Sequence, residues 1–194
     1  MTAAPQFHVR ATMIPVGYMA KKVIKKPEWL KADVVQDLYS VSNCLSKDFA
    51  DYIKYWKHNG YWFFDSTEII ENLAKENLLE LEATKLFYYE VYEHEFHDDD
   101  NVWHRFKPEA SFQTDVIVQR IKFLEGYDIA TFSVGTSPEC SPLSCNSLAS
   151  MIKTNKHCLL DSFEEAKKSL ERGQFKNSEP GPFRIFAVYS IERP

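Results

Sequence analysis

The feature that most constrains the fold is an internal self-similarity. Residues 52–68 align with residues 148–164 at a constant offset of 96. Five aligned pairs are identical: Lys57/Lys153, Asn59/Asn155, Asp65/Asp161, Ser66/Ser162 and Glu68/Glu164. Shorter matches lie on both sides, residues 39–41 with 132–134 and residues 89–92 with 186–189. Because the matches keep their order along the chain, the sequence predicts a duplicated unit.

Each copy carries a similar series of elements. Apolar residues at helical spacing predict a helix from Phe49 to Trp56 that ends at Asn59-Gly60, with a shorter counterpart over residues 148–152. Residues 61–64 and 157–160 are apolar runs of strand length, and each run ends at an Asp-Ser pair.

The Asp-Ser pairs predict two helix starts. Asp65 with Glu68, and Ser162 with Glu165, have the spacing of a capping box, in which the first side chain accepts a backbone N–H. The predicted helices cover residues 67 to about 81 and residues 163–172, the second ending at Gly173. Aromatic strands over residues 86–95 and 183–191 then close the two copies.

These elements predict an α+β fold of two similar halves, with mixed or antiparallel sheets and helices packed on one side. The first half, residues 1–106, includes a leader of about ten residues and a hairpin extension. The second half, residues 107–194, includes a loop rich in Cys, Pro and Ser. A length of 194 residues fits one compact unit of this kind.

Charge and cysteine content restrict the partners and the compartment. The 28 acidic against 23 basic residues leave no excess to neutralise phosphates, so we expect no nucleic-acid partner. The early apolar stretch, residues 11–20, contains Pro15 and Gly17 and is followed by lysines, the reverse of a secretory signal. No apolar run approaches the ~18 residues of a membrane span. We therefore expect a cytoplasmic protein with reduced thiols and no membrane partner.

The first place where the halves differ is the loop over residues 135–146. Cys140, Cys145 and Cys158 could form a three-thiolate zinc site, or Cys140 and Cys145 could form a two-thiolate site with His157. His157 and Cys158 point to opposite faces if both lie in a strand, so only one of them could bind the ion. Alternatively, Cys145 near a helix start is a candidate nucleophile with His157 as its base. Anion binding through Ser144, Asn146 and backbone amides and a plain proline-rich turn are the other interpretations.

The second place is the predicted hairpin over residues 93–106. With Asp99 and Asp100 at its tip, Glu95 pairs with His104 and His97 lies diagonally across from His104. Two histidines and one carboxylate at this reach could bind Zn, Mn or Fe. The alternative is a solvated acidic loop.

The sequence has no phosphate loop, GxGxxG, HExxH or G-x-S-x-G motif, which favours a non-enzymatic function. We expect a protein-binding or regulatory protein, such as an inhibitor or immunity-like protein, with an acidic and aromatic surface and no required cofactor. The candidate binding residues are Trp103, Phe106, Cys140, Cys145 and Asn146. The alternatives are a metal- or thiol-dependent enzyme with its site between the halves, and a structural zinc protein.

Overall fold

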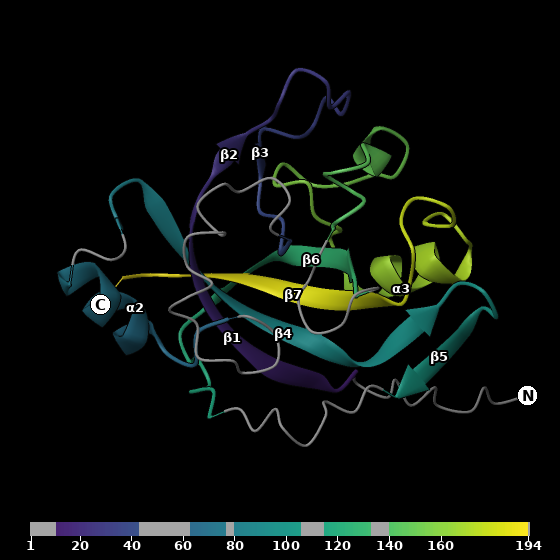
Figure 1. Ribbon diagram of the computed structural model, residues 1–194. Helices are drawn as coiled ribbons and strands as arrows, with labels where there is room; N and C mark the ends of the chain where they lie inside the picture. Colours follow the sequence, from purple (N-terminus) through teal and green to yellow (C-terminus); the bar gives the residue numbers. More distant parts are fainter. Residues whose placement is uncertain (1–10, 43–62, 77–79, 106–114, 133–139, 194) are drawn as a thin grey trace, which may run out of the picture.

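The computed structural model describes residues 11–42, 63–76, 80–105, 115–132 and 140–193. These residues form a five-stranded antiparallel sheet with the order β1-β4-β7-β6, while β5 pairs with β4 (Figure 1). The strands are β1 (Met13–Lys22), β4 (Thr84–His97), β5 (Val102–Arg105), β6 (Phe123–Thr131) and β7 (Phe183–Ile191). A separate two-stranded ribbon joins β2 (Ile24–Lys25) to β3 (Asp37–Leu38). The predicted α+β class is confirmed, and of the two predicted sheet types, mixed or antiparallel, the described strands form the antiparallel one.

The two predicted closing strands are the inner strands of the sheet. β7 has the predicted bounds, and β4 extends two residues further at each end than predicted. The outer strands β1 and β6 were not predicted, because each has an irregular register that interrupts the alternation of apolar side chains. The interruptions fall between Pro15 and Gly17 and between Leu124 and Gly126.

The two helices begin after serines that align in the sequence. α2 (Thr67–Lys75) has Ser66 as its N-cap, and α3 (Phe163–Glu171) has Ser162. The predicted cap at Ser162 is confirmed, whereas the one at Asp65 is wrong, because the Ser66 side chain accepts from the backbone of Ile69.

The two helix ends differ in how well they were predicted. α3 ends one residue before its predicted end, and Gly173 follows with a φ of +69°. α2 ends at Lys75, six residues before its predicted end. The prediction extended the helix because apolar residues continue at helical spacing as far as Leu81, but such spacing does not by itself require a helix.

The predicted strand over residues 157–160 is wrong. Cys158 has a φ of +62°, and Asn155 accepts from the backbone N–H groups of His157 and Leu159, which makes this segment a turn. Only Leu160 forms a bridge to the sheet, opposite Tyr127 in β6. The predicted helix over residues 148–152 is a single 3-10 turn, η2 (Leu148–Ser150).

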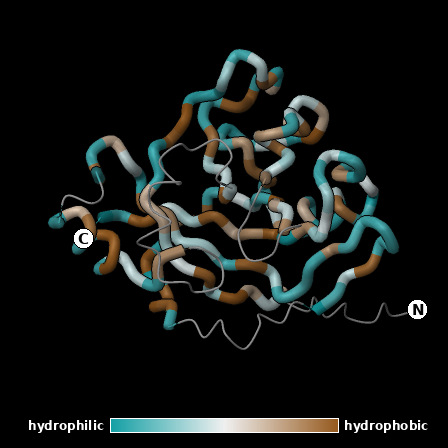
Figure 2. The backbone as a smooth tube through the Cα atoms, in the orientation of Figure 1, coloured by the Kyte–Doolittle hydropathy of each residue, from teal (hydrophilic) through white to brown (hydrophobic). Residues whose placement is uncertain are grey.

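Most aromatic side chains of the described strands are interior. Tyr18, Tyr88, Tyr89, Phe87 and Phe186 are among the largest fully buried residues. Figure 2 places apolar segments along the sheet and a largely hydrophilic chain at the β4–β5 turn. Several predictions lie outside the described residues: the leader, the helix over residues 49–56, residues 61 and 62, part of the Cys/Pro/Ser-rich loop, and Phe106.

Candidate functional site

The predicted β4–β5 hairpin is present with its predicted register. Glu95 pairs with His104, and His97 pairs with Val102. The His97 Nε2 atom lies 3.1 Å from Glu95 Oε1, and the rings of His97 and His104 are 4.6 Å apart. The structure therefore brings together the three residues that the sequence singled out on this hairpin.

Glu95, however, already has a strong partner. Arg184 donates through Nε and Nη2 to Glu95 Oε2, at 2.9 and 2.7 Å. Among the described residues, no group of three or more His, Cys, Asp and Glu side chains is arranged to hold a metal ion. Metal binding by Glu95, His97 and His104 stays a prediction without further support.

An acidic groove of about 520 Å³ lies between the β4–β5 turn and residues 177–181. Its carboxylates come from Asp98 and Asp99 on one wall and Glu179 on the other, and no lysine or arginine lines it. The walls approach closely, because a Cβ atom added to Gly181 would lie 2.6 Å from Asp98 Oδ1. The groove thus presents negative charge in a space that is open to solvent.

The loop that the sequence singled out supports one wall of this groove. The Asn146 side-chain amide donates to Ser178 O at 2.8 Å and to Glu179 Oε1 at 2.9 Å. The Cys140 thiol donates to Asn146 Oδ1 at 3.2 Å. Asn146 therefore orients Glu179 and connects the loop to the same site as the hairpin.

The cysteines do not form the predicted thiolate cluster. Cys145 is disulfide-bonded, whereas Cys140 and Cys158 are free. A sulfur in a disulfide is neither a nucleophilic thiolate nor a zinc ligand, so both predicted roles of Cys145 require a reduced form that the structure does not contain. Burial raises the pKa of the Cys158 thiol to about 12, which also opposes thiolate formation there.

Trp103, a candidate binding residue, is half-buried on the hairpin. Its ring packs against Tyr92 and Phe96, at centroid distances of 5.6 and 5.1 Å. Its indole N–H donates to Glu171 Oε1 at 3.0 Å, which ties the hairpin to α3. These contacts fix the position of the Trp103 ring, and its role in binding a partner stays a prediction.

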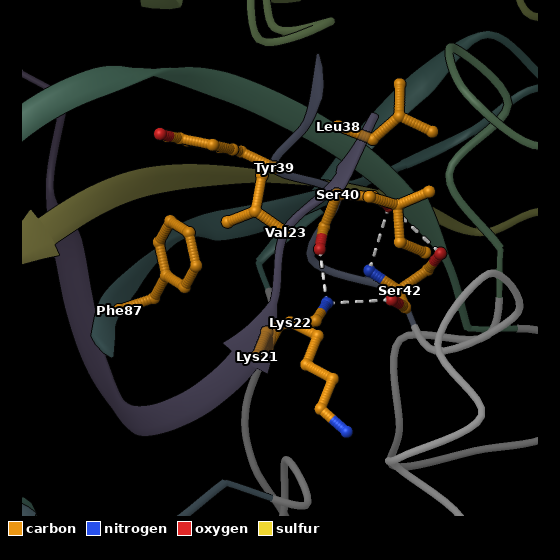
Figure 3. Close-up of a pocket in the computed structure, with 9 residues that line it drawn as sticks. Lys21, Lys22, Val23, Leu38, Tyr39, Ser40, Ser42 and Phe87 are labelled. Carbon is orange, nitrogen blue, oxygen red and sulfur yellow. Dashed lines mark hydrogen bonds between the residues drawn. The ribbon is translucent and has the colours of Figure 1, made fainter. Parts of the chain in front are cut away.

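A buried polar network that the sequence did not indicate surrounds Lys21 on β1. The Lys21 ammonium donates to the carbonyl oxygens of Ser40 and Ser42, and it lines a pocket of about 10 Å³ that has room for about one water molecule (Figure 3). Burial lowers the pKa of Lys21 to about 8, against the opposing attraction of Asp128.

Asp128 is the acidic member of this network. It accepts from Val41 N, Ile129 N and Ser141 Oγ, while its burial raises the pKa of its carboxyl group. The Lys21 pocket is too small for a substrate, so we assign the network to stability.

His157 lies in a second polar cluster. Its Nδ1 atom is 2.5 Å from Asp37 Oδ1, its Nε2 atom is 3.5 Å from Glu125 Oε2, and its ring stacks on Tyr39 at 3.9 Å. Lys85 donates to the Tyr39 hydroxyl at 2.6 Å. Both nitrogens of His157 thus face carboxylates, and the cluster fastens the β2–β3 ribbon to β6.

Within the described ranges, no helix has the length and apolar character needed to cross a membrane. Comparisons of this chain with protein-family models, curated proteins and solved structures find no match. The functional argument therefore rests on the geometry of the sites themselves.

Proposed function

We propose that this chain is a non-enzymatic binding protein whose partner inserts a basic segment into the acidic groove between the β4–β5 turn and residues 177–181. The observation that carries the proposal is the groove lining, in which Asp98, Asp99 and Glu179 face a space of about 520 Å³ without a lysine or arginine. An arginine side chain suits such a site, because its planar guanidinium pairs with carboxylates through several hydrogen bonds.

The rest of the site supports this proposal. Asn146 donates to the Glu179 carboxylate and holds it in place before a partner binds. The entropy cost of ordering this side chain on binding is therefore lower. The net charge of −5 favours encounter with a basic protein, as in an inhibitor or immunity-like protein that covers a positively charged surface.

The test is a binding titration with labelled peptides. A decapeptide that alternates Arg with Gly and Ser should bind saturably in fluorescence anisotropy, and its Glu-containing counterpart should not. The combined variant Asp98→Asn, Asp99→Asn, Glu179→Gln should weaken binding by about tenfold or more, equivalent to about 1.4 kcal/mol. Raising the salt concentration should weaken binding to the native protein more than to this variant.

A matched control changes the net charge by the same amount elsewhere. Glu76, Glu82 and Glu192 are exposed and lie outside the groove lining, so their replacement by Gln should leave the affinity almost unchanged. If both triple variants bind the Arg peptide equally weakly, the loss of affinity comes from net charge alone, and the proposed site is overturned. Failure of the Arg peptide to bind the native protein would overturn the proposed function.

We also propose that the two halves arose by duplication. Ser66 and Ser162 cap α2 and α3 at the offset of 96, and Phe64 and Leu160, two residues before these caps, bridge to β1 and β6. The inner strands β4 and β7, one from each half, then pair with each other. If this proposal is correct, replacing residues 65–76 by residues 161–172 should give a folded chain, and a chain without cooperative unfolding would contradict it.

The cytoplasmic location stays a proposal, and the disulfide at Cys145 argues against it. Structural disulfides are common in oxidising compartments and rare in the cytosol. Rapid alkylation of cells followed by peptide mass spectrometry distinguishes the two cases. Alkylated Cys145 would support the cytoplasm, and Cys145 that is labelled only after reduction would overturn it.

A further inference from the structure

A second groove, distant from the acidic one, lies beside α2. Figure 1 places α2 at one end of the sheet and the β4–β5 hairpin at the other. The groove has a volume of about 430 Å³, which falls within the usual range of small-molecule sites. Its lining comes from α2, Leu81, the start of β4 and the residue Arg193 beyond β7.

The floor of this groove is apolar. Ile70 and Leu86 are buried at 0% and 2% exposure, and Ala74 and Leu81 complete the apolar part of the lining. Contact with aliphatic groups would remove this surface from water, which favours an apolar ligand body.

The rim carries two cations without a carboxylate partner in the part of the chain that the structure describes. Arg193 donates through Nη2 to Leu81 O, Thr84 O and Thr84 Oγ1, which are all neutral oxygens. Lys75 forms no ion pair with any described residue, although Glu71 lies four positions before it on α2. Three neutral acceptors hold one nitrogen of Arg193, so its charge is positioned, and no carboxylate of the described residues pairs with it.

We propose that this groove binds an apolar monocarboxylate, of which a medium-chain fatty acid is the simplest form. The aliphatic chain lies against Ile70, Ala74 and Leu86, and the carboxylate faces Arg193 and Lys75. Among the lining residues, these two cations outnumber the single carboxylate of Glu71. This site is independent of the acidic groove and of its basic partner.

The test is calorimetric titration of the full chain with sodium decanoate below its micelle concentration, with decanol and decylammonium as probes that lack the negative charge. We expect saturable binding of one decanoate per chain, weaker binding of decanol and none of decylammonium. Arg193→Met should weaken decanoate binding by about tenfold, because it removes a charge-assisted hydrogen bond at the rim.

Two further variants keep the test decisive if Arg193→Met disturbs the turn at Leu81 and Thr84. Lys75→Met removes the other rim charge from an exposed helical position, and Ala74→Phe fills the groove, so both should weaken decanoate binding. Lys153→Met is the matched control, because Lys153 is exposed and outside the groove.

The overturning results are equally specific. The proposal fails if decanoate does not saturate, if decylammonium binds equally well, or if Lys153→Met weakens binding as much as Lys75→Met. It also fails if sedimentation shows a dimer that Ala74→Phe dissociates, since a second copy would then occupy the groove.

Discussion

Arg184 on β7 binds Glu95 on β4 through two nitrogens that share one carboxylate oxygen. Arg184 is only 6% exposed, and its guanidinium also lies 3.9 Å from the centre of the Phe132 ring. This pair joins the two inner strands next to the hairpin. Glu95, which the sequence singled out as a candidate metal ligand, therefore also neutralises a buried cation.

Replacing Glu95 by Gln should therefore destabilise the protein. The variant leaves the Arg184 guanidinium buried without a counter-charge, for which we expect a loss of about 2–4 kcal/mol in the free energy of unfolding. Urea denaturation measures this loss.

Glu93→Gln is the matched control for Glu95→Gln. Glu93 pairs at 3.5 Å with Arg105, whose side chain is 67% exposed, so we expect a loss below about 0.5 kcal/mol. Similar losses in the two variants would show that burial of the Arg184–Glu95 pair does not increase its contribution to the free energy of unfolding.

The pair of His157 and Asp37 should be coupled in a double-mutant cycle. The two side chains are 10% and 25% exposed, and they hold the β2–β3 ribbon against the sheet. With His157→Gln and Asp37→Asn we expect an interaction energy of about 1–2 kcal/mol near neutral pH.

His104 and Asp100 provide the comparison for this cycle. They are also a histidine–aspartate pair, at 3.6 Å, but their side chains are 51% and 56% exposed. Solvent screens such a pair, so the same cycle there should give almost no coupling. A larger interaction energy at the exposed pair would contradict the idea that burial strengthens the coupling.

Gly126→Ala should be strongly destabilising. Gly126 has a φ of +145°, and an added Cβ would lie 2.7 Å from both Leu159 Cβ and the Leu160 carbonyl oxygen. Because one of these atoms belongs to the backbone, relief requires the bridge between Tyr127 and Leu160 to move. We expect a loss of about 3 kcal/mol or more, measured by thermal and urea unfolding.

Gly173→Ala measures the cost of a positive φ where no atom crowds the added Cβ. Gly173 also has a positive φ, +69°, but nothing lies within 4 Å of an added Cβ. We expect about 1 kcal/mol from the left-handed conformation alone. Equal effects at the two glycines would exclude crowding as the cause at Gly126.

Ionisation of the Cys158 thiol should lower the free energy of unfolding at alkaline pH. Burial raises the pKa of its thiol from 9.0 to about 12, so the folded protein retains a proton that the unfolded chain releases. This contribution to stability is complete below pH 9 and is lost as the pH rises from 9 toward 12. At pH 10.5 the loss amounts to about 2 kcal/mol.

The measurement compares urea denaturation of the native protein and Cys158→Ala between pH 8 and 10.5. Lys21, with its pKa lowered to about 8, acts with the opposite sign, since the unfolded chain binds the extra proton and stability rises over this interval. Lys21 is present in both proteins and cancels in the comparison. Parallel pH profiles would contradict the assignment to Cys158.

The sequence predicted the elements that local chemistry specifies. β7 and α3 were predicted almost to the residue, because a buried aromatic run and a serine cap with a terminal glycine are signals within one short segment. The hairpin register was also predicted, since Asp and Asn residues locate its turn. β1 and β6 were missed, because their bulges shift the alternation that marks a strand.

The sequence predicted the β4–β5 hairpin, but it did not predict the acidic groove that its turn helps to form. The sequence singled out Asn146 and the acidic turn separately, but only the folded chain brings Asn146 to Glu179 and Glu179 to the groove opposite Asp98. Cys145, His157 and Cys158 were grouped by their closeness in sequence. The turn at Cys158 and the disulfide at Cys145 separate them chemically.

By itself, the sequence determined the α+β class, the inner strands, the Ser162 cap of α3 and the acidic character of the hairpin. Only the tertiary structure decided which polar groups lie together: Glu95 with Arg184, and Asp37 with His157. No lysine or arginine lines the groove beside Asp98 and Asp99. The physical reason is distance along the chain. Arg184 lies 89 positions from Glu95, and His157 lies 120 positions from Asp37. Local patterns specify backbone conformation and burial, whereas the pairing of distant charges follows from the packing of the whole sheet.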